Sequence, residues 1–333
     1  MIIRCALLCQ AIEKTGQILP DGLNIDTCTP EGGVCLRRRS PCDGYIDEHA
    51  LGCPSKSVCC KQQPQAPPTE HPEPDSPDTD QCGLITRLPN RNLDPRLRVV
   101  GGDPAVEGEW PWQVSFGDVG GGHFCGGTLI SNQWIISAAH CFERKVPEDV
   151  TVILGEHHQE FESGNEKFAK IDKVIMHPDY SRVHGLPNDI ALVKLTSPVD
   201  ISGHYVRTAC TPSEVGVFNE QDICYISGWG YTQGTGDNVY LRHLQIEITS
   251  LNSCNTSWNG VITNKQICLG TGTEGACQGD SGGPLVCLRN NQYVLAGATS
   301  WGSLTCTADG FPNVYTDIMS YLPWIRGYIT DLI

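Results

Sequence analysis

The chain has no excess of basic residues and no long apolar run. Its 333 residues include 23 lysines and arginines against 38 aspartates and glutamates, which gives a formal net charge of −15. Such a charge argues against nucleic acid and anionic membranes as partners. The charge suits an extracellular protein. No segment of the sequence is long and apolar enough to span a bilayer.

The 18 cysteines lack the repeated Cys-x2-Cys spacing that is typical of zinc sites. A cytosolic chain of this length rarely carries so many cysteines, so they indicate disulfides and a secreted protein. Residues 1–20 resemble a secretory signal whose short apolar core is broken by Arg4, and we expect a truncated signal peptide. An ordinary mature N-terminus stays open as the alternative.

Cysteine spacing and composition divide the first 98 residues further. Residues 28–60 carry six cysteines in a segment too short to bury a core, so we expect a small disulfide-rich domain. Residues 61–81 are rich in proline, glutamate and aspartate, which predicts an extended, solvated linker. Residues 82–98 form the segment before the main domain, which we place at 99–333.

The segment 28–60 resembles the clip domain of invertebrate proteases, because its last two cysteines are adjacent and follow spaced ones. It is shorter than the usual clip domain between the third and fourth cysteines. The sequence alone leaves the cysteine connectivity open. The resemblance implies the pairs Cys28–Cys59, Cys35–Cys53 and Cys42–Cys60.

A serine lies among glycines in the sequence Gly279-Asp280-Ser281-Gly282-Gly283. There a tight backbone can expose the hydroxyl and leave main-chain N–H groups free to bind an oxyanion. A serine nucleophile needs a base, and the base needs an orienting acid. No histidine follows Ser281, which excludes the Ser–acid–His order of α/β-hydrolases. The base must therefore lie upstream.

Two upstream segments supply the base and the acid. His140 lies among small residues directly before Cys141, which can fix its position. Asp189 heads the apolar run 190–195, where a carboxylate needs a partner if it is buried. The order is then His–Asp–Ser. The Asp–His–Ser order of subtilisins needs an aspartate upstream of His140 and explains none of the cysteine pattern.

From Val99 to Ile333 the chain resembles the chymotrypsin/trypsin family of serine endopeptidases. The matching motifs are VVGG at 99–102, the His140 and Asp189 segments, GDSGGP at 279–284 and SWG at 300–302. The resemblance implies an all-β fold of two packed six-stranded antiparallel barrels with a C-terminal helix. Short strand patterns, such as 150–154 and 285–288, favour the same fold. Helical spacing from Tyr321 onward predicts the helix, with Pro323 in its first turn.

The resemblance implies the catalytic roles. Ser281 attacks the peptide carbonyl, His140 transfers the proton, and Asp189 orients His140. The main-chain N–H groups of Gly279 and Ser281 form the oxyanion hole. The segment that pairs with the substrate backbone comprises Ser300, Trp301 and Gly302.

Arg98 precedes Val99 in a sequence that resembles the activation site of the family. Cleavage there frees the Val99 α-ammonium, which in the family pairs with the acid before the nucleophile, here Asp280. Ser115 and His123 match the positions that hold this acid in chymotrypsinogen-like zymogens. An upstream trypsin-like protease is implied as the activator.

The resemblance also pairs every cysteine from Cys82 onward. The pair Cys82–Cys210 would keep the segment before Val99 attached, so that cleavage gives two disulfide-linked chains. Cys5 and Cys9 stay unassigned, within residues 1–20. The other implied pairs are Cys125–Cys141, Cys224–Cys287, Cys254–Cys268 and Cys277–Cys306.

The resemblance places Gly275 and then Ala276 at the floor of the specificity pocket, where trypsin-like enzymes begin with an aspartate. Without that carboxylate, burial of a basic substrate side chain is costly. Gly302 leaves the mouth open, and the amide of Asn313 at a second floor position shortens the pocket. We expect a chymotrypsin-like or broad neutral preference, with Leu, Tyr, Phe and Met before the cleaved bond.

Glu156 and Glu166 resemble the glutamates of the calcium loop of the family, where the carbonyls of His158 and Phe161 would join them. Ser163 stands where trypsin has a third acid, so a solvated acidic loop is an equal alternative. We expect no required cofactor, with calcium at most structural.

Asn255 begins an Asn-Thr-Ser acceptor sequence for N-glycosylation. The resemblance implies a monomer that cleaves proteins or peptides and is bound by protein protease inhibitors. Two alternatives stay open: a non-catalytic homologue that acts as a binding or adaptor protein, and a trypsin-like cascade protease.

Overall fold

The structure is a computed structural model of the chain. It describes residues 81–86, 102–120, 122–212, 217–231 and 238–329, together with the strands at 34–37, 45–47 and 57–61. The chain divides into a smaller unit, residues 1–72 with 160–164, and a larger unit, residues 73–159 with 165–333. Within the described parts, no helix is long and apolar enough to cross a membrane.

The smaller unit contains a three-stranded antiparallel sheet. Its strands lie in the order β1 (Val34–Arg37), β3 (Ser57–Lys61) and β2 (Tyr45–Asp47). The clip-like cysteine pairing, the signal-like residues 1–20 and the expected cleavage site after Arg98 lie outside the described residues.

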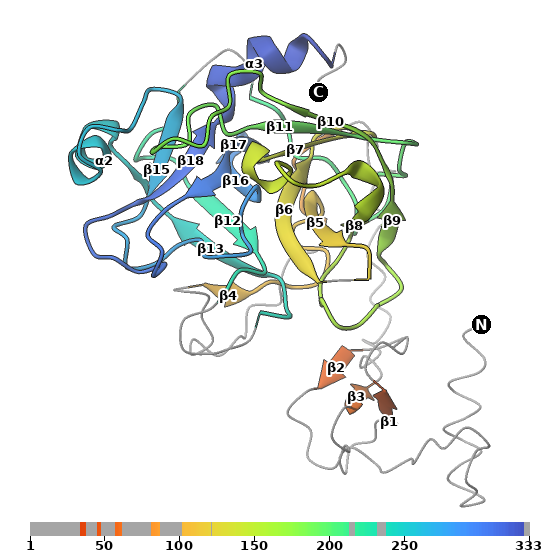
Figure 1. Cartoon of the computed structure of the whole chain (residues 1–333). Coiled ribbons are helices and arrows are strands. Elements are labelled where there is room, and N and C mark those ends of the chain that lie inside the picture. Colours follow the sequence, from red (N-terminus) through yellow and green to blue (C-terminus); the bar gives the residue numbers. More distant parts are fainter. Residues whose placement is uncertain are drawn as a thin grey trace, which may run out of the picture. The chain divides into compact units, whose positions relative to one another are not determined.

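The larger unit is built from two curled antiparallel sheets, coloured yellow to green and cyan to blue in Figure 1. The first has the order β10-β11-β7-β6-β5-β8-β9 and the second the order β14-β15-β18-β17-β16-β12-β13-β4. The strands of the first sheet are β5 (Gln113–Asp118), β6 (His123–Leu129), β7 (Trp134–Ser137), β8 (Val150–Leu154), β9 (Lys167–Ala169), β10 (Ile171–Met176) and β11 (Ala191–Leu195). Those of the second are β4 (Asp103–Pro104), β12 (Cys224–Gly228), β13 (Arg242–Ile246), β14 (Ile248–Thr249), β15 (Gln266–Leu269), β16 (Pro284–Arg289), β17 (Gln292–Trp301) and β18 (Asn313–Asp317).

The all-β class with a C-terminal helix is confirmed. The sheets have seven and eight strands, where we expected six in each barrel. The additional strands are short pieces at the sheet edges, among them the two-residue strands β4 and β14. Among the described residues, the larger unit also contains two 3-10 turns, η1 (Ala139–Cys141) and η2 (Pro147–Asp149), and two α-helices, α2 (Leu251–Ser257) and α3 (Ile318–Arg326).

Helix α3 begins earlier than predicted. The Asp317 side chain caps it by accepting a hydrogen bond from the Met319 N–H at 3.2 Å. The first turn therefore precedes Tyr321, and Pro323 lies inside the helix instead of in its first turn. A proline there leaves the carbonyl of Met319 without its helical N–H partner.

Apolar side chains from alternate strand positions fill the interiors of the sheets. In the first sheet β8 buries every second residue, and the fully buried Phe116 packs among the side chains from its neighbours. A second cluster around Leu285 and Tyr315 fills the other sheet. Five disulfides join the pairs that the resemblance implies: Cys82–Cys210, Cys125–Cys141, Cys224–Cys287, Cys254–Cys268 and Cys277–Cys306.

Candidate active site

The fold brings His140 and Asp189 together, although 49 positions separate them in the sequence. His140 lies in the turn η1, which follows strand β7. Asp189 lies just before β11, which pairs with β7 so that Ala191 faces Ser137. The Asp189 carboxylate accepts two hydrogen bonds from His140, one from Nδ1 at 2.8 Å and one from the main-chain N–H at 2.9 Å. This pair of bonds fixes both the ring and the turn that carries it.

Asp189 is almost completely buried, at 1% exposure, and receives further bonds from the second sheet. Ser300 Oγ donates to Asp189 Oδ2 at 2.6 Å, and Thr316 Oγ1 donates to the Asp189 carbonyl at 2.7 Å. A buried carboxylate is stable only when hydrogen bonds or a cation satisfy it. Sequence reasoning assigned Ser300 to the substrate backbone and missed its side-chain contact with Asp189.

The environment of His140 prepares it to act as a base. Burial lowers the pKa of His140, but the hydrogen bond and charge of Asp189, together with the charge of Glu143, outweigh burial and leave the pKa above its ordinary value. The Asp189 bond to Nδ1 also selects the tautomer that has its free lone pair on Nε2. That nitrogen can then accept a proton.

The turn that contains Ser281 requires a glycine at the next position, Gly282. Gly282 has φ +75°, and a Cβ there would collide with Ser137 Oγ. The Ser281 carbonyl accepts a hydrogen bond from the Gly126 N–H at 2.8 Å and lies 3.8 Å from Cys141 Sγ. The serine is therefore held beside the His140 turn.

No hydrogen bond of 3.5 Å or less joins Ser281 Oγ to His140 among the described residues. In proteases without substrate this bond is often long and tightens only when the substrate is bound. The contacts of both residues with Cys141 Sγ place Ser281 and His140, the predicted nucleophile and base, as neighbours.

Two main-chain N–H groups around Ser281 point away from the protein's own acceptors. The N–H groups of Asp280 and Gly283 donate to carbonyls within the turn, whereas those of Gly279 and Ser281 meet no acceptor in the described part of the chain. The Tyr231 N–H binds the Gln278 carbonyl at 2.9 Å, which turns the Gly279 N–H to the opposite side of that peptide. The pair has the arrangement of an oxyanion hole.

A family model supplies the comparison. The model described as Trypsin matches residues 99–325, which is more than half of the chain. The chain belongs to the trypsin family. It is therefore a serine endopeptidase, a hydrolase of peptide bonds, and the expected resemblance is confirmed for the larger unit.

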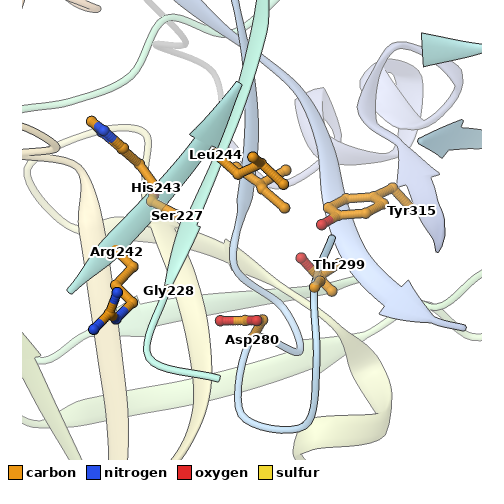
Figure 2. A pocket seen from close by; sticks show the side chains of 10 residues that line it. Ser227, Gly228, Arg242, His243, Leu244, Asp280, Thr299 and Tyr315 are labelled. Atoms are coloured by element: carbon orange, nitrogen blue, oxygen red, sulfur yellow. The ribbon is translucent and has the colours of Figure 1, made fainter. Parts of the chain in front are cut away.

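The acid that precedes the trypsin-family nucleophile is buried without a side-chain cation among its bonded partners. Asp280 Oδ1 accepts from the Gly230 N–H at 2.7 Å, and Oδ2 accepts from the Cys277 N–H at 2.9 Å. Burial raises the pKa of Asp280 to about 6, although these two bonds act in the opposite direction. Asp280 lines a cavity of about 10 Å³, and Figure 2 shows Thr299 and Tyr315 on one side of Asp280. A cavity of this size is close to the smallest that can hold one water molecule.

The expected zymogen contacts of Asp280 differ in the structure. Ser115 Oγ and His123 Nδ1 lie 2.8 Å apart, as neighbours. His123 Nε2, however, meets the Gly279 carbonyl at 2.8 Å, and the Asp280 oxygens are occupied by main-chain N–H groups. The contact fixes the Gly279–Asp280 peptide, which directly follows the Gly279 N–H of the candidate oxyanion hole.

Asn313 lies at the predicted floor of the specificity pocket. Its Oδ1 accepts from the buried Ala276 N–H at 2.8 Å. A Cβ at Gly275 would collide with this oxygen, and a Cβ at Gly302 would lie 2.8 Å from the other amide atom, Nδ2. The Asn313 amide therefore spans the space between the two glycines. No carboxylate is placed there by Gly275 or Ala276.

The rim of the pocket combines a disulfide with aromatic packing. Cys277–Cys306 joins the two walls, and Gln278 Nε2 donates to the Leu304 carbonyl at 2.9 Å. Trp301 packs edge-on against Trp258, with ring centroids 4.7 Å apart. Sequence reasoning missed Gln278 and Trp258, because neither belongs to a motif.

The predicted calcium site involves Glu156 and Glu166. Glu156 is buried, and its Oε1 accepts from the His157 and His158 N–H groups at 2.9 and 3.0 Å. Glu166 lies in the same unit, whereas Phe161 belongs to the smaller unit and is described separately. Carboxylate oxygens suit calcium, and the site stays a prediction.

Asn255 lies in α2, and its Oδ1 accepts from the Ile262 N–H at 3.0 Å. Its use as a glycosylation site also stays a prediction. In the described residues one group of three metal-binding side chains lies close together, Cys125, His140 and Cys141. Its cysteines form a disulfide, so their sulfurs are not free to bind a metal.

Proposed function

We propose that the chain is a secreted zymogen that, once cleaved, hydrolyses peptide bonds with His140, Asp189 and Ser281 and accepts a neutral side chain before the cleaved bond. The observation that carries the proposal is the buried Asp189 carboxylate, which accepts bonds from both the ring and the main chain of His140. Such a carboxylate orients an imidazole and stabilises its protonated form.

The catalytic cycle follows from these contacts. Ser281 attacks the substrate carbonyl while His140 Nε2 takes its proton and later gives it to the leaving amine. Asp189 stays ionised and stabilises the imidazolium. The N–H groups of Gly279 and Ser281 bind the oxyanion, and each such donor is worth about 3 kcal/mol in the transition state.

Activation is proposed at the bond after Arg98. The Val99 ammonium that cleavage releases would meet Asp280, a buried carboxylate that lacks a cation among its bonded partners. A new ion pair at this place stabilises the turn that carries Gly279 and Ser281. The activator has to recognise arginine, so we propose a trypsin-like protease upstream.

The disulfides support the proposals that the chain is secreted and that its cleavage gives two linked chains. Five bridges in the larger unit suit an oxidising compartment. The Cys82–Cys210 bridge would hold the segment before Val99 on the enzyme after cleavage. A signal peptide, a clip-like domain and an Asn255 glycan belong to the same proposal.

A neutral specificity is supported by the floor of the pocket. Neither Gly275 nor Ala276 offers a carboxylate, and Asn313 contributes an uncharged amide. A guanidinium buried there would be unpaired, at a cost of several kcal/mol. We therefore propose Leu, Met, Phe or Tyr before the cleaved bond, in protein or peptide substrates.

Other parts of the proposal concern binding. Glu156 and Glu166 would hold a calcium ion of purely structural role, with no part in the reaction. We propose a monomer that protein protease inhibitors bind at the substrate site. We disfavour the alternative of a non-catalytic homologue that acts as an adaptor protein, because the His140–Asp189 pair and the glycine turn of Ser281 are present.

A fluorophosphonate probe tests the proposal. The chain cleaved after Arg98 should react with the probe and hydrolyse peptides, and Ser281→Ala should lose both properties. The matched control is Ser303→Ala, a rim hydroxyl that contacts Thr305 and should leave both intact. Undiminished hydrolysis by Ser281→Ala would refute the assigned nucleophile.

A further inference from the structure

A carboxylate three residues after His140 links its turn to the segment that leads to Asp189. Glu143 Oε1 accepts a hydrogen bond from Tyr180 Oη at 2.7 Å, and Oε2 pairs with Arg182 Nη1 at 2.6 Å. The Glu143 side chain is 19% exposed and that of Arg182 is 66% exposed. Both partners precede Asp189 in the same connecting segment, which joins β10 to β11.

We propose that Glu143, held by Tyr180 and Arg182, is a positioning residue that ties the turn of the catalytic base to the segment of the catalytic acid. The inference rests on the proposed role of His140 as the base. Neither the serine motif nor the histidine motif contains Glu143. The contact joins two loops whose relative position decides whether His140 meets Asp189.

The two bonds to Glu143 differ in character. Burial and the Glu143 hydrogen bond raise the pKa of Tyr180, so its hydroxyl stays a donor at neutral pH. The ion pair between Arg182 and Glu143 is more exposed to water, so it contributes little to stability. Tyr180 therefore supplies the fixed contact, and Arg182 supplies the opposite charge.

Glu143 and Arg182 act in opposite directions on His140. The charge of Glu143 raises the pKa of His140, and the charge of Arg182 lowers it. Asp189 is the third charge that reaches the ring. The other elements beside His140 contribute uncharged groups: the Cys125–Cys141 disulfide from β6 and Ser281 from the glycine turn.

The test measures the titration of the His140 imidazole by NMR in the full-length Ser281→Ala chain. Glu143→Gln should lower the midpoint and Arg182→Gln should raise it, each by roughly 0.3 to 1 pH unit for a partly screened charge. The double variant should return close to the starting value. A purely structural role would not produce shifts of opposite sign.

An ion pair in another part of the larger unit gives the matched control. Arg289 Nη2 and Asp222 Oδ2 lie 2.7 Å apart, and neither charge is among those that reach His140. Asp222→Asn and Arg289→Gln should leave the midpoint unchanged. Midpoints that stay fixed, or move in the same direction, in both Glu143→Gln and Arg182→Gln would overturn the inference.

The clamp itself is tested with Tyr180→Phe, which removes one hydrogen bond and no charge. In the Ser281-containing enzyme it should lower kcat severalfold with little change in KM, because the His140–Asp189 geometry loosens. An unchanged kcat would contradict the clamp. Since the titration uses an inactive chain, its outcome does not depend on whether Ser281 is the nucleophile.

Discussion

At the scale of single residues, the hydrogen bonds of Asp189 decide what His140 can do. Its Oδ2 is shared between His140 Nδ1 and Ser300 Oγ. A carboxylate oxygen that accepts a second strong bond has less negative charge to offer the imidazole. Ser300 therefore moderates the basicity of His140.

The variant Ser300→Ala should move the acid limb of the activity profile. Without the Ser300 bond, Asp189 stabilises the imidazolium more strongly, so the pKa of His140 rises above its already raised value. Because only neutral His140 accepts the serine proton, activity is lost as pH falls through this pKa, and the limb moves to higher pH. The measurement is kcat/KM against pH, with Ser303→Ala as the control that keeps the original limb.

The amide of Asn313 should set the length of the pocket. In Asn313→Gly the space between Gly275 and Gly302 opens, which favours bulky substrate side chains. We expect the ratio of kcat/KM for Phe over Leu peptides to rise about tenfold, the effect of about 1.4 kcal/mol. An unchanged ratio would show that Asn313 does not limit the pocket.

Residues within contiguous motifs could be predicted from the sequence, and residues outside them could not. His140, Asp189 and Ser281 each stand in a local sequence pattern, and their order along the chain predicts their roles. Glu143 and Thr316 act through contacts between distant segments, which no local pattern reports. The contact of His123 with Gly279 was missed for the same reason, because the Gly279 carbonyl comes from the distant loop between β15 and β16.

At the scale of elements, the pairing of β7 with β11 brings His140 and Asp189 together. The residue Gly230, just after β12, supports Asp280. Gly230 follows β12, donates its N–H to Asp280 and leaves no space for a side chain. The Asp280 carboxylate occupies the space that a Cβ would need, which explains the glycine.

The variant Gly230→Ala should destabilise the protein. Its Cβ would collide with both Asp280 carboxylate oxygens, so the turn would have to shift and the buried N–H bond would weaken. We expect a loss of about 1–3 kcal/mol in the free energy of unfolding, measured by denaturant titration. Gly203→Ala, where the added Cβ meets no atom within 4 Å, should be close to neutral.

The bounds of elements with a strong hydrophobic pattern could be predicted from the sequence, whereas those of elements with a weak pattern could not. Strand β8 coincides with the expected 150–154, because its side chains alternate between buried and partly exposed. Helix α2 was not foreseen, since Leu251–Ser257 is mostly polar and its start depends on the Ser250 cap. The start of α3 depends in the same way on Asp317.

At the scale of the whole molecule, Asp280 should make stability depend on pH before cleavage. Its folded pKa of about 6 lies above the unfolded value of 3.8, so the folded state is favoured below the unfolded pKa. This contribution is lost as pH rises through the folded pKa, for a total of about 3 kcal/mol.

Urea unfolding of the uncleaved chain at a series of pH values measures this effect. The wild type should lose stability between about pH 4 and 7 relative to Asp280→Asn, whose amide does not titrate. Parallel curves for the two proteins would contradict a raised Asp280 pKa.

The two sheets carry the proposed triad and the proposed pocket, but the arginine of the proposed activation site does not suit that pocket. The chain should therefore cleave itself poorly and depend on another protease for cleavage after Arg98. Kinetics of the cleaved enzyme on matched Phe, Leu, Ala and Arg peptides test the account most directly. We predict the highest kcat/KM for Leu or Phe and a value lower by orders of magnitude for Arg, because no carboxylate is placed at the floor by Gly275, Ala276 or Asn313. Preference for the Arg peptide would contradict the account.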